Sequence, residues 1–269
     1  MKAWSKLGAE YQDDGMACTL GIDAGSGFTK AVIWEQGKIL AYSILPSGGN
    51  YSQTARKAAE MALQQKGISF DHISSTMATG WGAAAVDFAD KTASDISCHA
   101  AGVFSFFPSA RTVIDIGSQF TRGIKLDQKG KAIHFVQNEK CAAGSGKFLQ
   151  VIARILHIGL EEIGELSLKS ASPVEFTTGC AVFAESEAVS RISQGASPAD
   201  ILAGVHKAMA AKIANLMIRL GIAEDCIVTG GGAKDKGLIN ALQAELGIKV
   251  LVPKEPQISA ALGAALLAG

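Results

Sequence analysis

One short stretch, Leu20-Gly21-Ile22-Asp23-Ala24-Gly25-Ser26-Gly27-Phe28-Thr29-Lys30, occurs twice in this chain. Its second copy is Val113-Ile114-Asp115-Ile116-Gly117-Ser118-Gln119-Phe120-Thr121-Arg122, in which Asp, Gly, Ser, Phe and Thr keep their offsets and Arg replaces Lys. The segments that follow also correspond, because a Gly-containing turn at 35–38 matches the turn at 127–130 and a further apolar run follows each. Two copies predict a duplicated α/β fold, since a solenoid needs three or more stacked repeats.

Each copy predicts an apolar strand, a Gly/Ser hairpin and two further strands. Glycine at the hairpin tip permits positive φ and lets backbone N–H groups approach a ligand closely. Amides and hydroxyls suit phosphate oxygens, and a carboxylate suits Mg²⁺ or its bound water. One copy alone could equally be an ordinary tight hairpin. Two matched copies, each with Asp two residues before Gly, favour two opposed phosphate loops around the carboxylates Asp23 and Asp115.

The composition indicates a globular protein and argues against several partners. The chain has 269 residues, 48% of them hydrophobic and 19% charged, which suits two small lobes with buried cores. Lys+Arg and Asp+Glu both number 25, so no net charge points to nucleic acid or to an anionic membrane. Residues 1–15 lack the apolar segment of a signal peptide, and we expect no apolar run long enough to span a bilayer. The protein is therefore expected to be cytoplasmic.

The rest of the chain predicts alternating helices and strands. We expect a flexible extension over residues 1–16, a first lobe over 17–110 and a second lobe over 111–269. Residues 83–107 predict short helices, and the lone His99 is expected to be a satisfied local hydrogen-bonding residue. Small residues around Gly263 predict close packing of the last helix. Further helices are predicted over 51–66, 147–157, 181–193, 198–220, 235–246 and 258–267, and further strands over 73–79, 227–229 and 248–252.

Two more glycine-rich turns precede helices. Gly144-Ser145-Gly146 opens the helix predicted over 147–157, where exposed N–H groups at a helix start can contact a nucleotide. The strand at 227–229 leads into Gly230-Gly231-Gly232-Ala233, which suits an adenosine pocket. A merely flexible turn is the alternative interpretation of this second segment.

Several blocks of the sequence resemble known families. The motif at 23–30 and Asp-Ile-Gly-Ser at 115–118 look like the phosphate loops of the actin, hexokinase and Hsp70 ATPase superfamily. More specific blocks are Thr-Gly-Trp-Gly at 79–82, Ser-Cys-His at 97–99, Asn-Glu-Lys-Cys-Ala-Ala-Gly-Ser-Gly-Lys-Phe at 138–148 and Cys-Ala-Val-Phe-Ala-Glu-Ser-Glu at 180–187. These blocks are similar to activators of 2-hydroxyacyl-CoA dehydratases and to ATPase subunits of benzoyl-CoA reductases. The resemblance covers residues 17–269 and implies an actin-like (ribonuclease H-like) ATPase fold with two lobes around a nucleotide cleft.

The resemblance also implies ATP or ADP with Mg²⁺ as the bound nucleotide. Asp23, Asp115 and Gln119 would be the catalytic residues that serve Mg²⁺, water and phosphate. The nucleotide-binding residues would come from both phosphate loops and both glycine-rich turns, namely Gly25, Ser26, Gly27, Thr29, Lys30, Gly117, Ser118, Gly144, Ser145, Gly146, Gly230, Gly231, Gly232 and Ala233. Ser118 and Phe120 depart from the usual Asp-Ile-Gly-Gly-Gln-Asp of the dehydratase activators, which leaves the hydrolysis rate and the partner open.

The five cysteines are an odd number without the pattern of a secreted disulfide framework. Cys18, Cys98 and Cys226 lie in apolar or helix-like stretches and are expected to be buried thiols. Cys141 and Cys180 each precede a predicted helix, whose N-terminus would stabilise an anionic cluster. From the residues alone, these two could equally be inert core cysteines. The resemblance implies one [4Fe-4S] cluster that bridges a homodimer, with two thiolates from each chain.

The predicted function is therefore an ATP-dependent electron-transfer activator. It would take an electron from a ferredoxin or flavodoxin and deliver it, coupled to ATP hydrolysis, to an iron–sulfur acceptor enzyme. Two alternatives are a small-molecule kinase of the same superfamily and a cluster-free nucleotide-dependent regulator. The kinase would need an acceptor pocket, which is usually built from inserted segments, and the short chain shows no obvious insertion.

Overall fold

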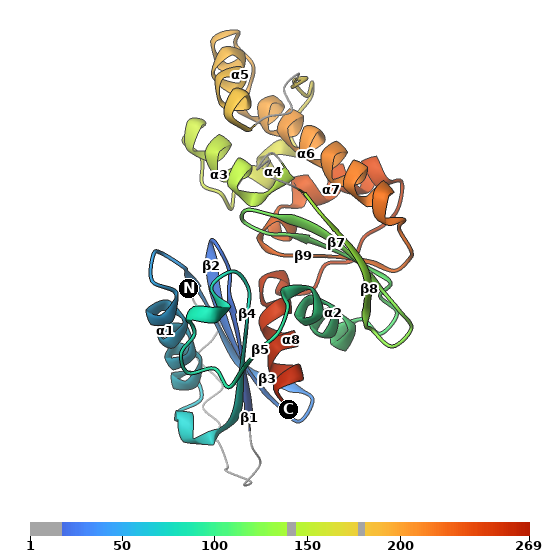
Figure 1. Cartoon of the computed structure of the whole chain (residues 1–269). Helices are drawn as coiled ribbons and strands as arrows, with labels where there is room; N and C mark the ends of the chain where they lie inside the picture. Colours follow the sequence, from blue (N-terminus) through green and yellow to red (C-terminus); the bar gives the residue numbers. More distant parts are fainter. Residues whose placement is uncertain (1–17, 139–143, 177–180) are drawn as a thin grey trace. The chain divides into compact units, whose positions relative to one another are not determined.

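The computed structural model describes residues 18–138, 144–176 and 181–269, so the extension expected over 1–16 lies outside it. The described chain forms two compact units (Figure 1). The first unit holds the residues up to Cys98 together with Ala260–Gly269, and the second unit is His99–Ser259. The chain passes between them inside helix α2 (Asp95–Phe106) and at the start of α8 (Ser259–Ala268). The last helix thus belongs to the first unit, and the boundary falls at residue 98 and not at 110.

The first unit contains a five-stranded sheet with the order β3-β2-β1-β4-β5. Its first three strands are antiparallel neighbours, whereas β4 runs parallel to β1 and β5 parallel to β4. The Asn50 side chain caps α1 by accepting from the Gln53 N–H at 3.0 Å. The elements are β1 (Cys18–Ala24), β2 (Phe28–Glu35), β3 (Lys38–Pro46), α1 (Tyr51–Gln64), η1 (Phe70–His72), β4 (Ile73–Thr79), η2 (Ala83–Ala85) and β5 (Lys91–Thr92).

Helix α8 belongs to this unit because it packs directly on β1. Every residue of β1 is buried, as a strand covered on both faces requires, and Figure 1 shows α1 and α8 on opposite sides of the sheet. A Cβ on Gly21 would overlap the Ala261 carbonyl oxygen and the Ala265 amide nitrogen. The Thr19 hydroxyl also donates to the Ala265 carbonyl at 2.8 Å. This contact confirms the close packing predicted for the small residues of the last helix.

The second unit contains a four-stranded sheet with the order β8-β7-β6-β9. Again three consecutive strands are antiparallel, and the fourth, β9, runs parallel to the first. The strand predicted over 248–252 is wrong, because in the described chain only a single bridge joins Leu251 to Ile227. The elements are β6 (Thr112–Ile116), β7 (Thr121–Leu126), β8 (Ala132–Gln137), α3 (Gly146–Ile155), α4 (Ile163–Ser167), α5 (Ala181–Ser193), α6 (Pro198–Leu220), β9 (Cys226–Thr229), η4 (Gly231–Lys234), α7 (Lys236–Leu246) and η5 (Pro256–Ile258).

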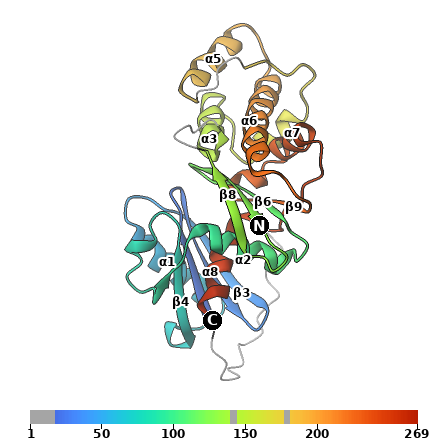
Figure 2. The same ribbon diagram turned by 45° about the vertical axis from the view of Figure 1, so that its right-hand side comes forward.

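Helix α6 is the long central helix of this unit, and α7 lies beside it (Figure 2). By length and composition alone its 23 residues could cross a membrane, which corrects the expectation that no apolar run is long enough. Most of its apolar residues are however buried in the core of the unit, including Ile201, Leu202, Met209, Ile213 and Met217. The apolar length of α6 is thus accounted for by packing.

A buried polar network ties α6 to the helices beside it. The His206 ring lies with Nδ1 2.9 Å from Ser167 Oγ and Nε2 3.0 Å from Asp235 Oδ2. Ser167 Oγ donates to the Gly164 carbonyl at 2.8 Å, and Asp235 Oδ1 accepts from the Leu238 N–H at 3.0 Å. These polar groups are bonded within the protein, so we regard the network as structural.

Candidate functional site

The loop at residues 23–30, which is predicted to bind phosphate, carries a largely buried ion pair. Asp23 and Lys30 are cross-strand partners in β1 and β2, and Lys30 Nζ donates to Asp23 Oδ2 at 2.8 Å. Their side chains are only 10% and 14% exposed. The Gly25 N–H donates to the Phe28 carbonyl at 3.1 Å, which closes the turn between the strands.

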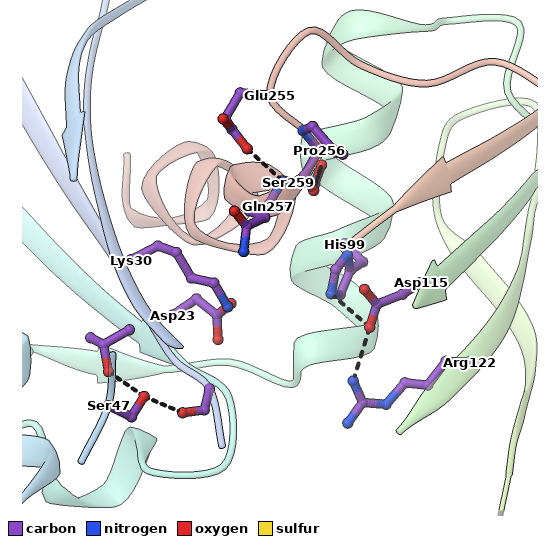
Figure 3. Close-up of polar contacts among 12 residues, drawn as sticks. Asp23, Lys30, Ser47, His99, Asp115, Arg122, Glu255, Pro256, Gln257 and Ser259 are labelled. Atoms are coloured by element: carbon purple, nitrogen blue, oxygen red, sulfur yellow. Dashed lines mark hydrogen bonds and ion pairs between the residues drawn. The ribbon is translucent and has the colours of Figure 1, made fainter. Parts of the chain in front are cut away.

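Two hydroxyls support this loop, one from Ser47 directly after β3 and one from Thr29 in β2 (Figure 3). Ser47 Oγ donates to the Gly25 carbonyl at 2.5 Å and lies 2.9 Å from Thr29 Oγ1. The Ser47 N–H donates to the Gly27 carbonyl at 3.1 Å. Since Thr29 is fully buried, its hydroxyl supports the loop from within, whereas Ser26 and Gly27 are half-buried at the tip.

The second loop repeats this geometry in the second unit. Asp115 and Arg122 are cross-strand partners in β6 and β7, and Arg122 Nη1 donates to Asp115 Oδ2 at 3.3 Å. The Gly117 N–H donates to the Phe120 carbonyl at 2.9 Å, just as Gly25 does to Phe28. Arg122 is itself held by Gln137, whose Oε1 accepts from Nε at 2.7 Å. The sequence repeat therefore encodes a carboxylate–cation pair beside the turn of each hairpin.

The start of α3 is fastened to the second loop. The Gly146 N–H donates to the Gly117 carbonyl at 2.9 Å, and the Lys147 N–H donates to the Ser118 carbonyl at 2.8 Å. The Thr121 hydroxyl donates to the Gly144 carbonyl. The expectation of exposed N–H groups at this helix start is wrong for these two amides, because loop carbonyls occupy them. Ser145 is fully buried, and Gln119 is exposed.

The glycine-rich turn after β9 packs tightly under the second loop. Gly230 has φ +82°, and a Cβ there would lie 2.5 Å from the Ile116 carbonyl oxygen and 2.6 Å from Asp115 Oδ1. A Cβ on Gly232 would overlap the Ile116 side chain, and Ala233 is buried. The Gly230 N–H donates to the Pro256 carbonyl at 3.0 Å. The turn is thus fixed in the structure, which argues against the flexible-turn alternative.

The first unit has an equivalent turn at Gly80-Trp81-Gly82, whose correspondence to the turn after β9 we did not recognise from the sequence. Thr79 and Thr229 end the parallel strands and pair with Asp23 and Asp115 respectively. Gly80, which follows Thr79, has φ +88°, and a Cβ there would lie 2.5 Å from Asp23 Oδ1. The signal is present in the sequence, because Thr-Gly-x-Gly-Ala occurs at both 79–83 and 229–233.

In both aspartates the two carboxylate oxygens have different surroundings. Within the described residues, Oδ2 of each carboxylate accepts from a cation, whereas Oδ1 accepts no hydrogen bond and faces the glycine of the Thr-Gly turn. An oxygen of this kind fits Mg²⁺ or a water bound to it.

His99 is a second residue that we misjudged from the sequence. Its Nε2 lies 3.4 Å from Asp115 Oδ2, and Figure 3 shows Asp115 between His99 and Arg122. Its Nδ1 is buried and has no hydrogen-bond partner in the described chain. The expectation of a satisfied local hydrogen-bonding residue is therefore wrong.

The two predicted cluster ligands, Cys141 and Cys180, lie outside the described residues. The other three cysteines, Cys18, Cys98 and Cys226, are buried thiols, as predicted. Burial raises the pKa of Cys98 to about 11 and that of Cys226 to about 12. These three thiols are therefore core residues.

Two sheets that share the same four-strand arrangement, each with an aspartate near the end of its first strand, define an ATPase of the actin-like fold. The chain belongs to the BadF/BadG/BcrA/BcrD ATPase family, whose model matches residues 20–268. It is 42% identical over 250 residues to the activator of lactoyl-CoA dehydratase of Anaerotignum propionicum, covering 93% of this chain and 96% of that protein.

Two solved structures of dehydratase activation proteins are also similar to this chain over nearly its whole length. Component A of (R)-2-hydroxyglutaryl-CoA dehydratase from Acidaminococcus fermentans is 38% identical with a TM-score of 0.90, covering 94% of this chain and 97% of that one. The activator of 2-hydroxyisocaproyl-CoA dehydratase from Clostridium difficile, solved with bound ADPNP, is also 38% identical with a TM-score of 0.90, covering 93% and 94%. The predicted fold, family and ATPase class are thereby confirmed.

Proposed function

We propose that this chain hydrolyses ATP in order to deliver a low-potential electron to a partner iron–sulfur enzyme. The observation that carries the proposal is the matched pair of carboxylate–cation contacts, Asp23–Lys30 and Asp115–Arg122, in a member of this ATPase family. The relatives named above are activators of 2-hydroxyacyl-CoA dehydratases, and this supports an acceptor of the dehydratase or benzoyl-CoA reductase type.

Different residues of the chain would have different roles in hydrolysis. The free Oδ1 atoms of Asp23 and Asp115 would hold Mg²⁺ or orient water, while Lys30 and Arg122 fix each carboxylate through Oδ2. The exposed Gln119 would help to orient the attacking water. The remaining predicted contacts divide between phosphates and adenosine. The loop residues Gly25, Ser26, Gly27, Gly117 and Ser118 would contact phosphates, the 144–146 turn would support the second loop, and residues 230–233 would receive the adenosine.

Cys141 and Cys180 are the proposed ligands of one [4Fe-4S] cluster in a homodimer. Two thiols per chain give the four thiolates that such a cluster needs when two chains meet about a two-fold axis. The burial of the other three cysteines in the cores leaves this pair as the donor set. When bound, the cluster would supply a one-electron redox centre. A ferredoxin or flavodoxin would be the electron donor, and a cytoplasmic location stays a prediction.

The conversion of ATP to ADP would drive the transfer by changing the protein's conformation. A nucleotide shifts a conformational equilibrium only by its differential affinity for the two states. The loop at residues 117–118 is bonded to the first turn of α3, and Cys141 lies a few residues before that helix in sequence. A change at the γ-phosphate would thus reach the proposed cluster ligand through a short covalent path.

The test is metal analysis on protein purified without oxygen, combined with the oligomer mass in the same sample. We expect about four iron and four sulfide per dimer and a reducible EPR signal. Cys141→Ser and Cys180→Ser should each lose the cluster and keep ATP binding, whereas the buried Cys226→Ala is the matched control and should keep both. An intact cluster in Cys180→Ser would refute the ligand assignment.

The alternatives have distinct outcomes in the same experiments. An iron-free protein that transfers the γ-phosphate to a small substrate would be a kinase. An iron-free protein that binds ATP without transfer would be a nucleotide-dependent regulator. Either result would reduce Cys141 and Cys180 to packing residues.

A further inference from the structure

His99 touches the second aspartate from a different element than Arg122 does. Its side chain comes from α2 and is 8% exposed, and its Nε2 lies 3.4 Å from Asp115 Oδ2. Arg122 reaches the same oxygen from β7 at 3.3 Å. The Asp115 side chain itself is 5% exposed, so water competes little for these contacts.

Two groups contact the same oxygen of this carboxylate, Arg122 through a hydrogen bond and His99 through a polar contact at 3.4 Å, and together they restrict its orientation. With Oδ2 held by His99 and Arg122, Oδ1 is directed to the Gly230 turn, where a Cβ would come within 2.6 Å of it. The first loop is simpler, because among the described residues the Asp23 carboxylate pairs with the single cation of Lys30. The second aspartate is therefore the more rigidly held of the two.

The other ring nitrogen of His99, Nδ1, also bears on the role of this residue. For Nε2 to donate to Asp115, the ring must carry its proton there, which leaves Nδ1 as an acceptor in the neutral form. Nδ1 is buried and has no partner in the described chain. A buried polar atom without a partner is costly, and native proteins rarely keep one in a residue that serves packing alone.

We propose that His99 is a positioning residue, which holds Asp115 in the orientation that ATP hydrolysis requires. This inference rests on the proposed ATPase function, but not on the iron–sulfur cluster. His99 would act through Asp115 and touch neither the phosphates nor the metal. Its removal should therefore lower kcat and leave nucleotide affinity nearly unchanged.

The test compares two substitutions that differ in a single property. His99→Gln can place an amide N–H near the position of Nε2, whereas His99→Leu fills similar space without a donor. We expect His99→Leu to lower kcat for ATP by about 10–100-fold with less than about a threefold change in ATP Kd, and His99→Gln to recover most of kcat. His134→Leu, at an exposed position on β8, is the matched control and should leave kcat unchanged.

A double-mutant cycle shows whether His99 acts through Asp115. In an Asp115→Asn background, His99→Leu should cause little further loss of kcat. If His99→Leu and His99→Gln lost kcat equally, and in proportion to their fall in Tm, the proposal would be overturned and His99 would be a structural residue. A wild-type protein without ATPase activity would overturn the proposed function as well, whereas an active wild type unaffected by His99→Leu would overturn this inference alone.

Discussion

Asp23 and Lys30 face each other across the first hairpin, and the Lys30 ammonium group donates to the Asp23 carboxylate at 2.8 Å. Both side chains are largely buried. Asp115 and Arg122 repeat this relationship in the second unit. The offset of seven residues between acid and base is thus the length of one hairpin, which returns the chain to the position opposite the acid.

The Asp23–Lys30 pair should contribute to stability as a buried pair. We expect Lys30→Met to lower the free energy of unfolding by about 3 kcal/mol, because it leaves the Asp23 carboxylate buried without its cation. Urea denaturation measures the change. Lys236→Met is the control, since Lys236 and Glu165 pair at the surface with side chains 73% and 59% exposed, and it should cost less than about 1 kcal/mol. Equal effects would show that the Asp23 site is well solvated.

Gly230 should be irreplaceable for a steric reason beyond its positive φ. Gly230→Ala forces a Cβ against Ile116 and Asp115, and we expect a loss of about 3 kcal/mol together with at least tenfold weaker nucleotide binding. Gly247→Ala is the matched control, because Gly247 has φ +67° and open space around it, and it should cost about 1 kcal/mol. Thermal unfolding measures the loss of stability, and nucleotide titration measures the loss of binding. If Gly230→Ala and Gly247→Ala behaved alike, the steric role assigned to Gly230 would be wrong.

The buried cysteines should be inert in the native protein. Since burial raises the pKa of Cys98 to about 11 and that of Cys226 to about 12, both remain thiols at pH 8. We expect iodoacetamide at pH 8 to modify them only after denaturation, as measured by peptide mass mapping. Modification of Cys226 in the folded protein would contradict its placement in the core.

The start of α6 should stabilise the fold in a pH-dependent manner. Hydrogen bonds from Ser170, Ser197 and the Ser172 amide lower the pKa of Asp200 from 3.8 to about 2. A lowered pKa in the folded state means that the ionised carboxylate adds stability above pH 3.8, and that this contribution is lost as the pH falls towards 2. Asp200→Asn should therefore lower Tm at pH 7, with the difference shrinking below pH 4. If the difference in Tm between the wild type and Asp200→Asn did not change with pH, the effect would come from altered packing and not from the charge of Asp200.

The secondary structure was largely predictable because local patterns carry it. The apolar runs ending in Gly/Ser hairpins gave the strands, and Ser197 with Pro198 marked the start of α6. The segment at 248–252 was mispredicted because its apolar residues pack beside β9 with a single bridge, and sequence pattern does not distinguish this from a strand.

The sequence by itself determined the duplication, the two aspartate loops and the family, because these depend on identical residues at fixed offsets. Only the tertiary structure decided which groups meet Asp115. His99 is separated from Asp115 by the rest of α2 and the loop before β6, and Gly230 lies more than a hundred residues beyond it, so no local pattern links the three. Their meeting depends on a parallel strand pair and on the packing of α2. Such contacts are set by long-range packing, which spacing along the chain does not encode.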